Sequence, residues 1–258
     1  MIANYHTHTW RCMHATGTEK AYVENAIEGG LKILGFSDHT PQLYPDGYVS
    51  SSKMTPQQLE GYVDTVLKLK EEYKNDIEIH VGLETEYYPA IFDKLLDFIS
   101  DYPIEYMLLG QHNLGNEIGD FFSGAPTDDV SNLTRYVDQC IEAIDTGCFT
   151  YVAHPDLIYY TGPDEIYIPE MTRLAQHAKK KDIPLEINFL GLMEDRNYPD
   201  ARFWKIVEAT GNRVIFGSDA HVEHKVWNPE TLKKAEAMVK ENHLHLIDTV
   251  DLVKPVRK

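Results

Sequence analysis

Residues 214–221 read Val-Ile-Phe-Gly-Ser-Asp-Ala-His, a short apolar run that ends in two potential metal ligands, Asp219 and His221. The first apolar run of the chain ends in a similar pair, His6 and His8. Side chains two positions apart on a strand point to the same face, so each pair can converge on a metal ion. The pattern predicts one metal site built from both ends of the chain.

Seven short apolar runs along the chain are typical of buried strands. They cover residues 2–6, 32–36, 77–83, 105–111, 149–153, 184–188 and 214–218. Longer segments of helical period lie between them, and this alternation favours parallel strands with helical crossovers, as a closed barrel or an open sheet. No long linker or low-complexity stretch interrupts the pattern, so we expect residues 1–258 to form a single α/β domain.

Two of the predicted helices have a recognisable start. In the segment 56–73, Thr55 can cap the first turn, Pro56 suits the first helical position, and Gln58 stands where a capping-box partner belongs. Asn228-Pro229 gives the same signal before the last predicted helix.

Composition excludes several classes of partner. Lys and Arg number 24 against 41 Asp and Glu, a net charge of −17, which argues against a nucleic-acid partner because such surfaces are usually basic. The sequence contains no run of about 18 apolar residues, so a membrane partner is not expected. The N-terminus lacks the basic region and the apolar stretch of a signal peptide. The cysteines Cys12, Cys140 and Cys148 are odd in number without Cys-x-x-Cys spacing, so a cytoplasmic protein is expected. The sequence indicates no particular oligomeric state.

Residues that commonly bind metals follow the predicted strands. They are His6 and His8 after the first, His39 after the second, Glu84 at the end of the third, His112 after the fourth, His154 after the fifth, and Asp219 and His221 after the seventh. In a parallel barrel these strand ends form the active-site face, so the residues would gather in one bowl. A lone histidine is more often a surface or hydrogen-bonded residue, but repetition at five strand ends favours a metal site. Glu86 would point to the same face of the strand as Glu84. We prefer Glu84 as the metal ligand, because Glu84 ends the predicted strand.

Taken together, these segments resemble the polymerase and histidinol phosphatase (PHP) family. The resemblance is carried by His6-x-His8, His14, Gly35-Phe36-Ser37-Asp38-His39, Glu84, His112, His154-Pro155-Asp156 and Gly217-Ser218-Asp219-Ala220-His221, in the family's order over almost the whole chain. The stand-alone histidinol-phosphate phosphatases are most similar, through the segments 35–41, 154–158, 185–188 and 216–221. The resemblance implies a distorted seven-stranded (β/α) TIM-like barrel, in agreement with the seven strand signals.

The resemblance also implies three divalent metal ions. A first would be held by His6, His8, Glu84 and Asp219, a second by Glu84, His112 and His154, and a third by His14, His39 and His221. Imidazole and carboxylate ligands suit zinc, iron or manganese. Glu84, Asp219 and His221 are the expected catalytic residues, with Asp219 or a neighbouring histidine passing a proton to the leaving group.

The expected reaction is hydrolysis of a phosphate monoester. Two metal ions can share a water and lower its pKa toward about 7, which makes a metal-bridging hydroxide the expected nucleophile. An acidic protein needs local positive charge to bind a phosphorylated substrate. Arg196 is the first candidate, since a guanidinium can grip phosphate in a bidentate way, and Arg11 beside His8 is the second. His224 is a further substrate-binding candidate, and the acidic loop 113–130 is expected to form the rim.

Three functions of different classes fit this pattern. The first is hydrolysis of L-histidinol phosphate to L-histidinol and phosphate in histidine biosynthesis. The second is a broader phosphoesterase, or a phosphodiesterase or nuclease, against which the net charge of −17 counts. The third is a non-catalytic protein with a structural or degraded metal site, against which the complete ligand set argues. The sequence leaves open which metal binds, how broad the substrate range is, and which residues recognise the imidazole and amine.

Overall fold

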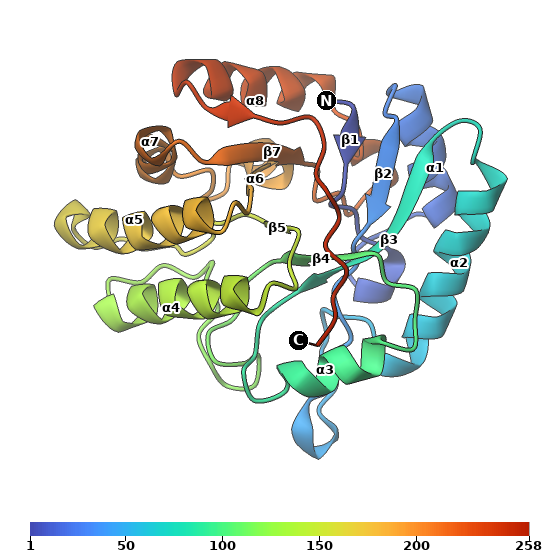
Figure 1. Cartoon of the computed structure of the whole chain (residues 1–258), viewed down its shortest axis with the longest axis horizontal. Coiled ribbons are helices and arrows are strands. Elements are labelled where there is room, and N and C mark those ends of the chain that lie inside the picture. The colour runs from blue at the N-terminus through green and yellow to red at the C-terminus, as the bar shows by residue number, and fades with distance from the viewer. Residues whose placement is uncertain (258) are drawn as a thin grey trace.

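In the part of the chain that the structure describes, eight parallel strands lie side by side in sequence order and curl into an incompletely closed barrel (Figure 1). The computed structural model describes residues 1–257. The strands are β1 (Ala3–Asn4), β2 (Ile33–Phe36), β3 (Glu78–Thr85), β4 (Tyr106–Leu109), β5 (Tyr151–Val152), β6 (Leu185–Asn188), β7 (Arg213–Gly217) and β8 (His245–Leu246). Each of the first seven overlaps a predicted strand. The sequence pattern does not predict β8, because it is short and partly polar.

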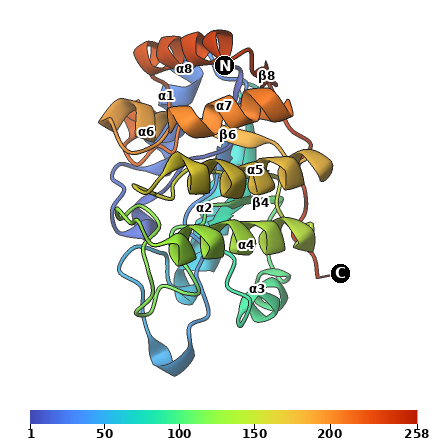
Figure 2. The ribbon, with the colours of Figure 1, turned by 90° about the vertical axis from the view of Figure 1, so that its left-hand side faces the viewer.

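Helices connect the strands and cover the outside of the barrel. They are α1 (Glu19–Glu28), α2 (Leu59–Glu72), α3 (Phe92–Ile99), α4 (Val130–Thr146), α5 (Asp164–Lys180), α6 (Phe189–Glu194), α7 (Ala201–Thr210) and α8 (Pro229–Glu241). Figure 2 shows α4, α5, α7 and α8 stacked along one side, while α1 and α2 lie on the opposite side in Figure 1. Among the described residues, no helix has the length and apolar character of a membrane span.

Both predicted helix starts are confirmed. The Thr55 N–H donates to Gln58 Oε1 at 2.7 Å, and the two residues complete a capping box. The first turn after it is a 3-10 helix, η3 (Pro56–Gln58), from which α2 continues. Asn228 Oδ1 accepts a hydrogen bond from the Thr231 N–H at 2.9 Å at the start of α8.

A small cluster of side chains fills the inside of the barrel. Its buried members are Ala3, Tyr5, Tyr106, Leu108, Tyr151, Ala153 and Ile215. The Tyr106 hydroxyl donates to the Tyr5 carbonyl at 2.6 Å, and a Cβ atom at Gly35 or Gly82 would collide with the Tyr106 side chain. Glycine at these two strand positions leaves the room that the tyrosine occupies. The larger part of the apolar core lies between the strands and the helices.

The barrel closes at the C-terminal ends of its strands. There the segment after β1 runs beside the segment after β7, with a parallel bridge between Thr7 and Ala220. Asn4 Nδ2 donates to Ser218 Oγ at 2.7 Å, and the Ser218 N–H donates back to Asn4 Oδ1 at 3.0 Å. These bonds join the two segments that carry the first and last predicted ligand pairs.

The opposite end of the barrel is covered by the C-terminal segment. After β8 pairs with β7, the chain crosses this end of the barrel, as the red trace in Figure 1 shows. Ile247, Val250 and Leu252 pack there against the interior cluster. The active-site face at the other end is left to the loops that follow the strands.

Candidate metal centre

The carboxylate of Glu84, near the end of β3, lies among five histidines. His154 Nε2 is 2.8 Å from Glu84 Oε1, and His39 Nδ1 is 2.9 Å from Oε2. The remaining three approach to 3.5–3.6 Å and are His6, His8 and His112. Both oxygens of this one carboxylate therefore lie within reach of several imidazoles.

Asp219 lies beside this group, at the end of β7. Its Oδ1 is 3.0 Å from His8 Nε2 and 3.5 Å from His6 Nε2. Both Asp219 and His154 have left-handed backbone conformations, with φ of 50° and 29°. Such conformations are costly for residues other than glycine and cluster at functional sites. Their presence at these two residues is consistent with side chains that point from the strand ends into a functional site.

Two further histidines, His14 and His221, stack with His8 at the open side of the centre. The ring centroids of His8 and His221 are 4.0 Å apart, and those of His14 and His221 are 4.6 Å apart. His14 follows a 3-10 turn, η1 (Trp10–Cys12), and its Nδ1 lies 2.7 Å from the Cys12 carbonyl. This contact turns Nε2 of His14 toward the other rings. Ligand atoms of His14, His39 and His221 lie within 4.8 Å of one another.

A carboxylate lies behind each of two histidine rings and orients the His6 ring by a hydrogen bond. His6 Nδ1 lies 2.8 Å from Glu186 Oε1, and His8 Nδ1 lies 3.5 Å from Asp38 Oδ1. Metal-binding histidines usually donate their second ring N–H to such a group, which sets the tautomer and raises ligand basicity. Nε2 of both rings is thus left to face Glu84 and Asp219.

The polar atoms of the centre fit metal ions. Glu84 Oε2, His154 Nδ1 and His221 Nε2 are buried and make no hydrogen bond among the described residues. Unsatisfied buried polar atoms are costly, and a bound cation would satisfy those that face the centre. Mixed nitrogen and oxygen donors suit borderline divalent metals. The residues present can therefore hold divalent metal ions.

Ionisation in the cluster follows from burial and charge pairing. Burial alone would raise the pKa of Glu84, but His112, His39 and His6 hold that pKa well below its usual range. For His8, burial is outweighed by Asp219 and Asp38, which raise its pKa to about 9. Glu84 is thus ready as an anionic ligand, while His8 carries a proton that an incoming metal ion would displace.

Cys12 joins the group in a way that the sequence pattern does not predict. Its sulfur and ligand atoms of His8 and His221 lie within 4.8 Å of one another. The side chain is fully buried, and this burial raises the pKa of the thiol. Because only the thiolate is a good metal ligand, the protonated thiol favours the histidines as the donors here.

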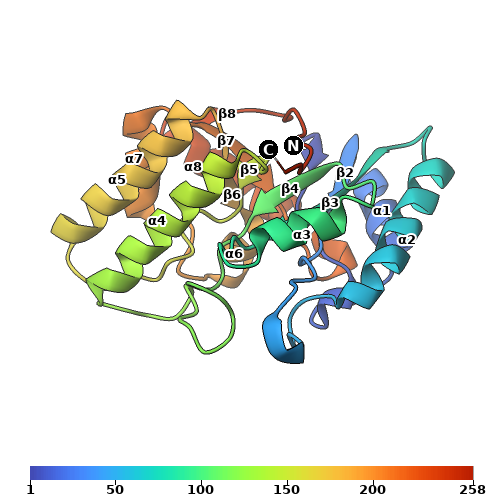
Figure 3. The same ribbon diagram turned by 60° about the horizontal axis from the view of Figure 1, so that its bottom comes forward.

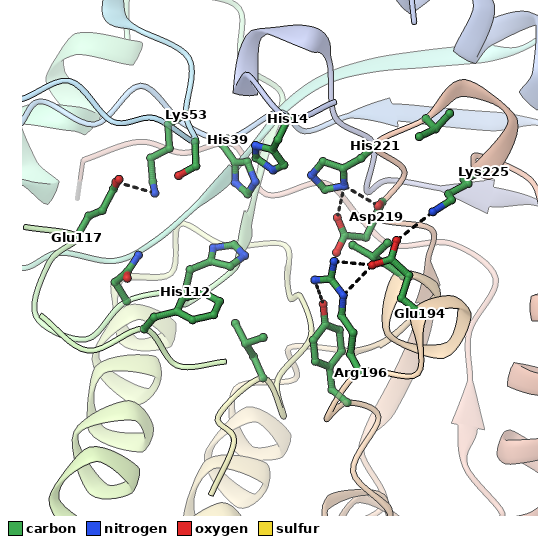
Figure 4. A pocket seen from close by; sticks show the side chains of 17 residues that line it. His14, His39, Lys53, His112, Glu117, Glu194, Arg196, Asp219, His221 and Lys225 are labelled. Atoms are coloured by element: carbon green, nitrogen blue, oxygen red, sulfur yellow. Dashed lines mark hydrogen bonds and ion pairs between the residues drawn. The ribbon is translucent and has the colours of Figure 1, made fainter. Parts of the chain in front are cut away.

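A cavity of about 580 Å³ opens above the cluster (Figure 4). His14, His39, His112, Asp219 and His221 line one part of it, and Lys53, Glu117, Glu194, Arg196 and Lys225 carry its other charges. Glu194 sits between two of the cations: its Oε2 is 2.7 Å from Arg196 Nη2, and its Oε1 is 3.0 Å from Lys225 Nζ. The cavity combines a cationic wall with the histidine-rich cluster.

Comparison with known families settles which family the chain belongs to. The family model of the PHP domain matches residues 4–189. This range includes all the predicted metal ligands except Asp219 and His221, which follow β7. The chain belongs to the PHP domain family.

Two relatives named as histidinol-phosphatases match over most of the chain. The probable histidinol-phosphatase of Deinococcus radiodurans is 27% identical over 85% of this chain and 86% of its own length. The histidinol-phosphatase of Lactococcus lactis is 21% identical over 95% of this chain and 93% of its own length.

Solved structures share the fold of this PHP domain. The crystal structure of Lactococcus lactis histidinol phosphate phosphatase, complexed with zinc, L-histidinol and phosphate, superposes with a TM-score of 0.74 at 20% identity, covering 98% of this chain and 97% of that one. The putative histidinol phosphatase of Listeria monocytogenes gives a TM-score of 0.73 at 20% identity, over 89% and 99% of the two chains. At this identity the likeness shows the fold, a distorted barrel as the sequence predicts.

The PHP domain brings all nine predicted metal ligands to one end of the barrel. They are His6, His8, His14, His39, Glu84, His112, His154, Asp219 and His221. Arg196, from the segment after α6, lines the cavity as expected.

The other two substrate-binding candidates lie elsewhere. Arg11 is buried, pairs with Glu19, and donates to the Gly61 carbonyl at 3.1 Å and to Thr65 Oγ1 at 3.2 Å. It does not line the cavity, because the η1 turn directs it toward α1 and α2. His224 is exposed in the 3-10 turn η4 (Glu223–Lys225), and its neighbour Lys225 reaches the cavity instead.

Sequence reasoning assigned no role to several residues that surround the ligands. Glu186 and Asn188 both point from β6 into the centre, where Asn188 Nδ2 is 2.9 Å from Glu186 Oε2 and 3.1 Å from Asp219 Oδ2. Their two-residue spacing, the same as that of His6 and His8, is the signal that could have found them. Lys53 comes from a loop and gives no periodic signal.

Proposed function

We propose that this chain is a metal-dependent phosphomonoesterase that hydrolyses L-histidinol phosphate to L-histidinol and phosphate, a step of histidine biosynthesis. The observation that carries the proposal is the Glu84 carboxylate among five histidines beside a cavity of about 580 Å³. Relatives that cover most of the chain bear the name histidinol-phosphatase. A small phosphorylated substrate fits the size of the cavity and its cations.

Three groups of donors support a centre of three divalent ions, with zinc, iron and manganese as the candidates. His6, His8 and Asp219 form one group, His6, Glu84 and His154 form another, and His14, His39 and His221 form the third. We assign Glu84 and Asp219 with His6 and His8 to the first ion, Glu84 with His112 and His154 to the second, and His14, His39 and His221 to the third. When bound, such ions lower the pKa of water and neutralise charge on phosphoryl oxygens.

Arg196 is the proposed phosphate clamp. Its Nη1 donates to the Tyr198 hydroxyl at 3.1 Å, and its Nε and Nη2 donate to Glu194. The two contacts hold a long side chain at the cavity wall, so its fork is positioned before a phosphate arrives. A guanidinium so held can donate two parallel hydrogen bonds to phosphoryl oxygens and stabilise the charge that spreads over them.

Proton transfer to the leaving alkoxide is assigned to the Asp219 and His221 pair. Both line the cavity, and His221 Nδ1 lies 3.0 Å from the Asp219 carbonyl, which fixes that ring. Nε2 of His221 is buried without a hydrogen-bond partner among the described residues. The assignment rests on their position, because both side chains lie at the edge of the cavity, where a leaving alkoxide would take up a proton.

The rim offers matching groups for the rest of the substrate. Glu117 and Glu194 are carboxylates that line the cavity away from the histidine cluster, and Phe122 and Leu157 give it an apolar wall. An amino alcohol that carries an imidazole needs an anion for its ammonium and an apolar face for its ring. The rim of this cavity provides both.

The test is a comparison of kcat/KM for three substrates. Phosphate release from L-histidinol phosphate, a generic phosphomonoester and a dinucleotide diester would be measured with protein loaded separately with zinc, manganese or iron. We expect a preference for L-histidinol phosphate of at least about 100-fold, the discrimination that a site built for specific polar groups can provide. Equal turnover of both monoesters would remove the substrate assignment. Faster cleavage of the diester would replace the function with that of a phosphodiesterase.

A further inference from the structure

Lys53 is a buried cation beside the metal centre. Its side chain is 3% exposed, and its Nζ lies 2.9 Å from both Glu86 Oε1 and Glu117 Oε2. Lysine is seldom buried unless it is paired, because burial of a lone charge is costly. Two carboxylates on different segments therefore hold this one ammonium group.

Glu86 connects Lys53 to a metal ligand. Its Oε1 lies 3.3 Å from Nδ1 of His112, the ring whose Nε2 faces Glu84 at 3.6 Å. Glu86 is 1% exposed, and its carboxylate oxygens make no other contact with a cation and no hydrogen bond among the described residues. The charge of Glu86 is thus balanced by Lys53 and oriented between Lys53 and His112.

The loop that carries Lys53 is fastened at the same place. Gln42 Nε2 donates to the Glu86 carbonyl at 3.0 Å, and Ser50 Oγ donates to Glu117 Oε1 at 2.7 Å. Tyr44 also donates to Glu117. In Figure 3 the loop around residues 45–50, coloured blue, projects beyond the body of the protein near the green loop that follows β4. Lys53 and Glu117 thus join two rim loops to one another and to His112.

We propose that Lys53 is a positioning residue for the second metal site: it holds Glu86 against Nδ1 of His112 and, through Glu117, couples the closure of the loop 42–54 to the affinity of that site for metal. The proposal rests on the proposed function in one respect, because it takes His112 as a metal ligand. In this proposal Glu86, the alternative to Glu84 near the end of β3, contacts the Nδ1 side of His112 and is not itself a metal ligand.

The variants that test it are Lys53→Met and Lys53→Arg. The matched control is Lys70→Met, because Lys70, Glu105 and His80 form the same kind of trio at the other end of β3, with Glu105 Oε1 2.8 Å from Lys70 Nζ and 3.2 Å from His80 Nδ1. Lys70 lines no part of the cavity. Thermal unfolding of each variant identifies those that fold.

Two measurements without substrate decide the proposal. Metal affinity is measured by competition with a chromogenic chelator, and closure of the loop by limited proteolysis within residues 44–50. We expect Lys53→Met to weaken zinc binding at one class of site about 10–100-fold, which is the usual effect of removing a residue that supports a metal ligand. We also expect it to speed proteolytic cleavage of the loop. Lys53→Arg should restore most of both properties, and Lys70→Met should change neither.

The double variant Lys53→Met/Glu86→Gln gives an independent check. If Lys53 acts through Glu86, the double variant binds zinc no more weakly than Lys53→Met alone, because residues of one network are not additive. Unchanged zinc affinity in a folded Lys53→Met variant would overturn the proposal. So would a rise in KM with zinc affinity intact, which would make Lys53 a substrate contact. Failure of the chain to hydrolyse L-histidinol phosphate would leave these metal measurements unaffected and would count against the proposed function alone.

Discussion

Glu186 Oε1 lies 2.8 Å from Nδ1 of His6, and both side chains are fully buried. The same carboxylate accepts a hydrogen bond from the His154 N–H at 3.0 Å through Oε2. One buried anion therefore supports a ligand of the first proposed metal site and the backbone of a ligand of the second. Burial disfavours the charged form of His6, but Glu186 and Asp219 outweigh burial and hold its pKa well above the usual value.

Glu186→Gln is expected to weaken metal binding. The amide keeps the volume and can still accept the His6 N–H, but it removes the charge that makes the imidazole a stronger donor. We predict a loss of about 10–100-fold in zinc affinity, measured by chelator competition. The control is Glu105→Gln, which alters the contact of Glu105 with His80 at the N-terminal end of β3, and it should leave zinc affinity unchanged. Equal affinity of Glu186→Gln and the unmodified protein would show that this carboxylate has no part in metal binding.

Glu84→Gln is expected to be the most damaging change in the centre. It removes a carboxylate that approaches five histidines, which is the ligand proposed to be shared by the first two sites. We predict a fall in kcat of at least about 10³-fold, the upper end of the cost of removing one electrostatic group from an active site. Glu86→Gln should cost less, about 10–100-fold, because Glu86 contacts His112 from behind. The reverse order in steady-state assays would make Glu86 the bridging ligand.

Arg196 and Arg11 are predicted to have opposite effects. Arg196→Met should raise KM for L-histidinol phosphate about 10–100-fold, since hydrogen bonds to a charged group contribute about 1.5–3 kcal/mol. Its free energy of unfolding should change little, because Arg196 and its partner Glu194 are both exposed. Arg11→Met breaks a buried pair with Glu19 and should lower the free energy of unfolding by about 3–5 kcal/mol. Urea unfolding and steady-state kinetics check both, and a KM effect confined to Arg11 would restore it as the phosphate ligand.

Asp156 is predicted to make stability depend on pH. Burial raises its pKa from 3.8 to about 7, although its carboxylate accepts hydrogen bonds from the Asp200 N–H at 2.6 Å and the Trp204 indole at 2.9 Å. The folded protein therefore binds a proton that the unfolded chain has released. The resulting stabilisation is fully present below about pH 4 and is lost as the pH rises through about 7.

Asp156→Asn removes this titration and keeps an oxygen for both donors. The variant should be more stable than the unmodified protein at pH 8, by an amount on the order of 1–4 kcal/mol, with little difference at pH 4. Urea unfolding at both pH values, in the same metal state, measures this difference. A constant difference between the two proteins across this range would contradict a raised pKa for Asp156.

The strands and the potential ligands at their C-terminal ends could be predicted because both leave local signals, whereas His14 was indicated by the family resemblance alone. An apolar run followed by a histidine or carboxylate is visible within ten residues, and parallel topology then gathers the strand ends without further information. The two residues of β8 leave no such signal. β8 is placed by its pairing with β7 and by the packing of Ile247 on the barrel interior, which are tertiary effects.

Residues on turns were harder to place. Arg11 is near His8 in sequence, but the intervening 3-10 turn sends its side chain to Glu19 and away from the cavity. Lys53 lies on a loop without periodicity, and its role depends on contacts with Glu86 and Glu117, which are distant in sequence. Side chains on loops take their direction from turn geometry and distant partners, neither of which a spacing rule contains.

The most direct test of a Glu84-centred hydrolytic metal centre is a metal titration of the metal-free protein. Bound zinc and the rate of phosphate release from L-histidinol phosphate would be measured in the same samples, beside Glu84→Gln. The account predicts that activity is absent after chelation, returns as zinc binds up to three equivalents, and does not return in Glu84→Gln. Full activity in the metal-free protein, or zinc binding that never produces phosphate release, would contradict it.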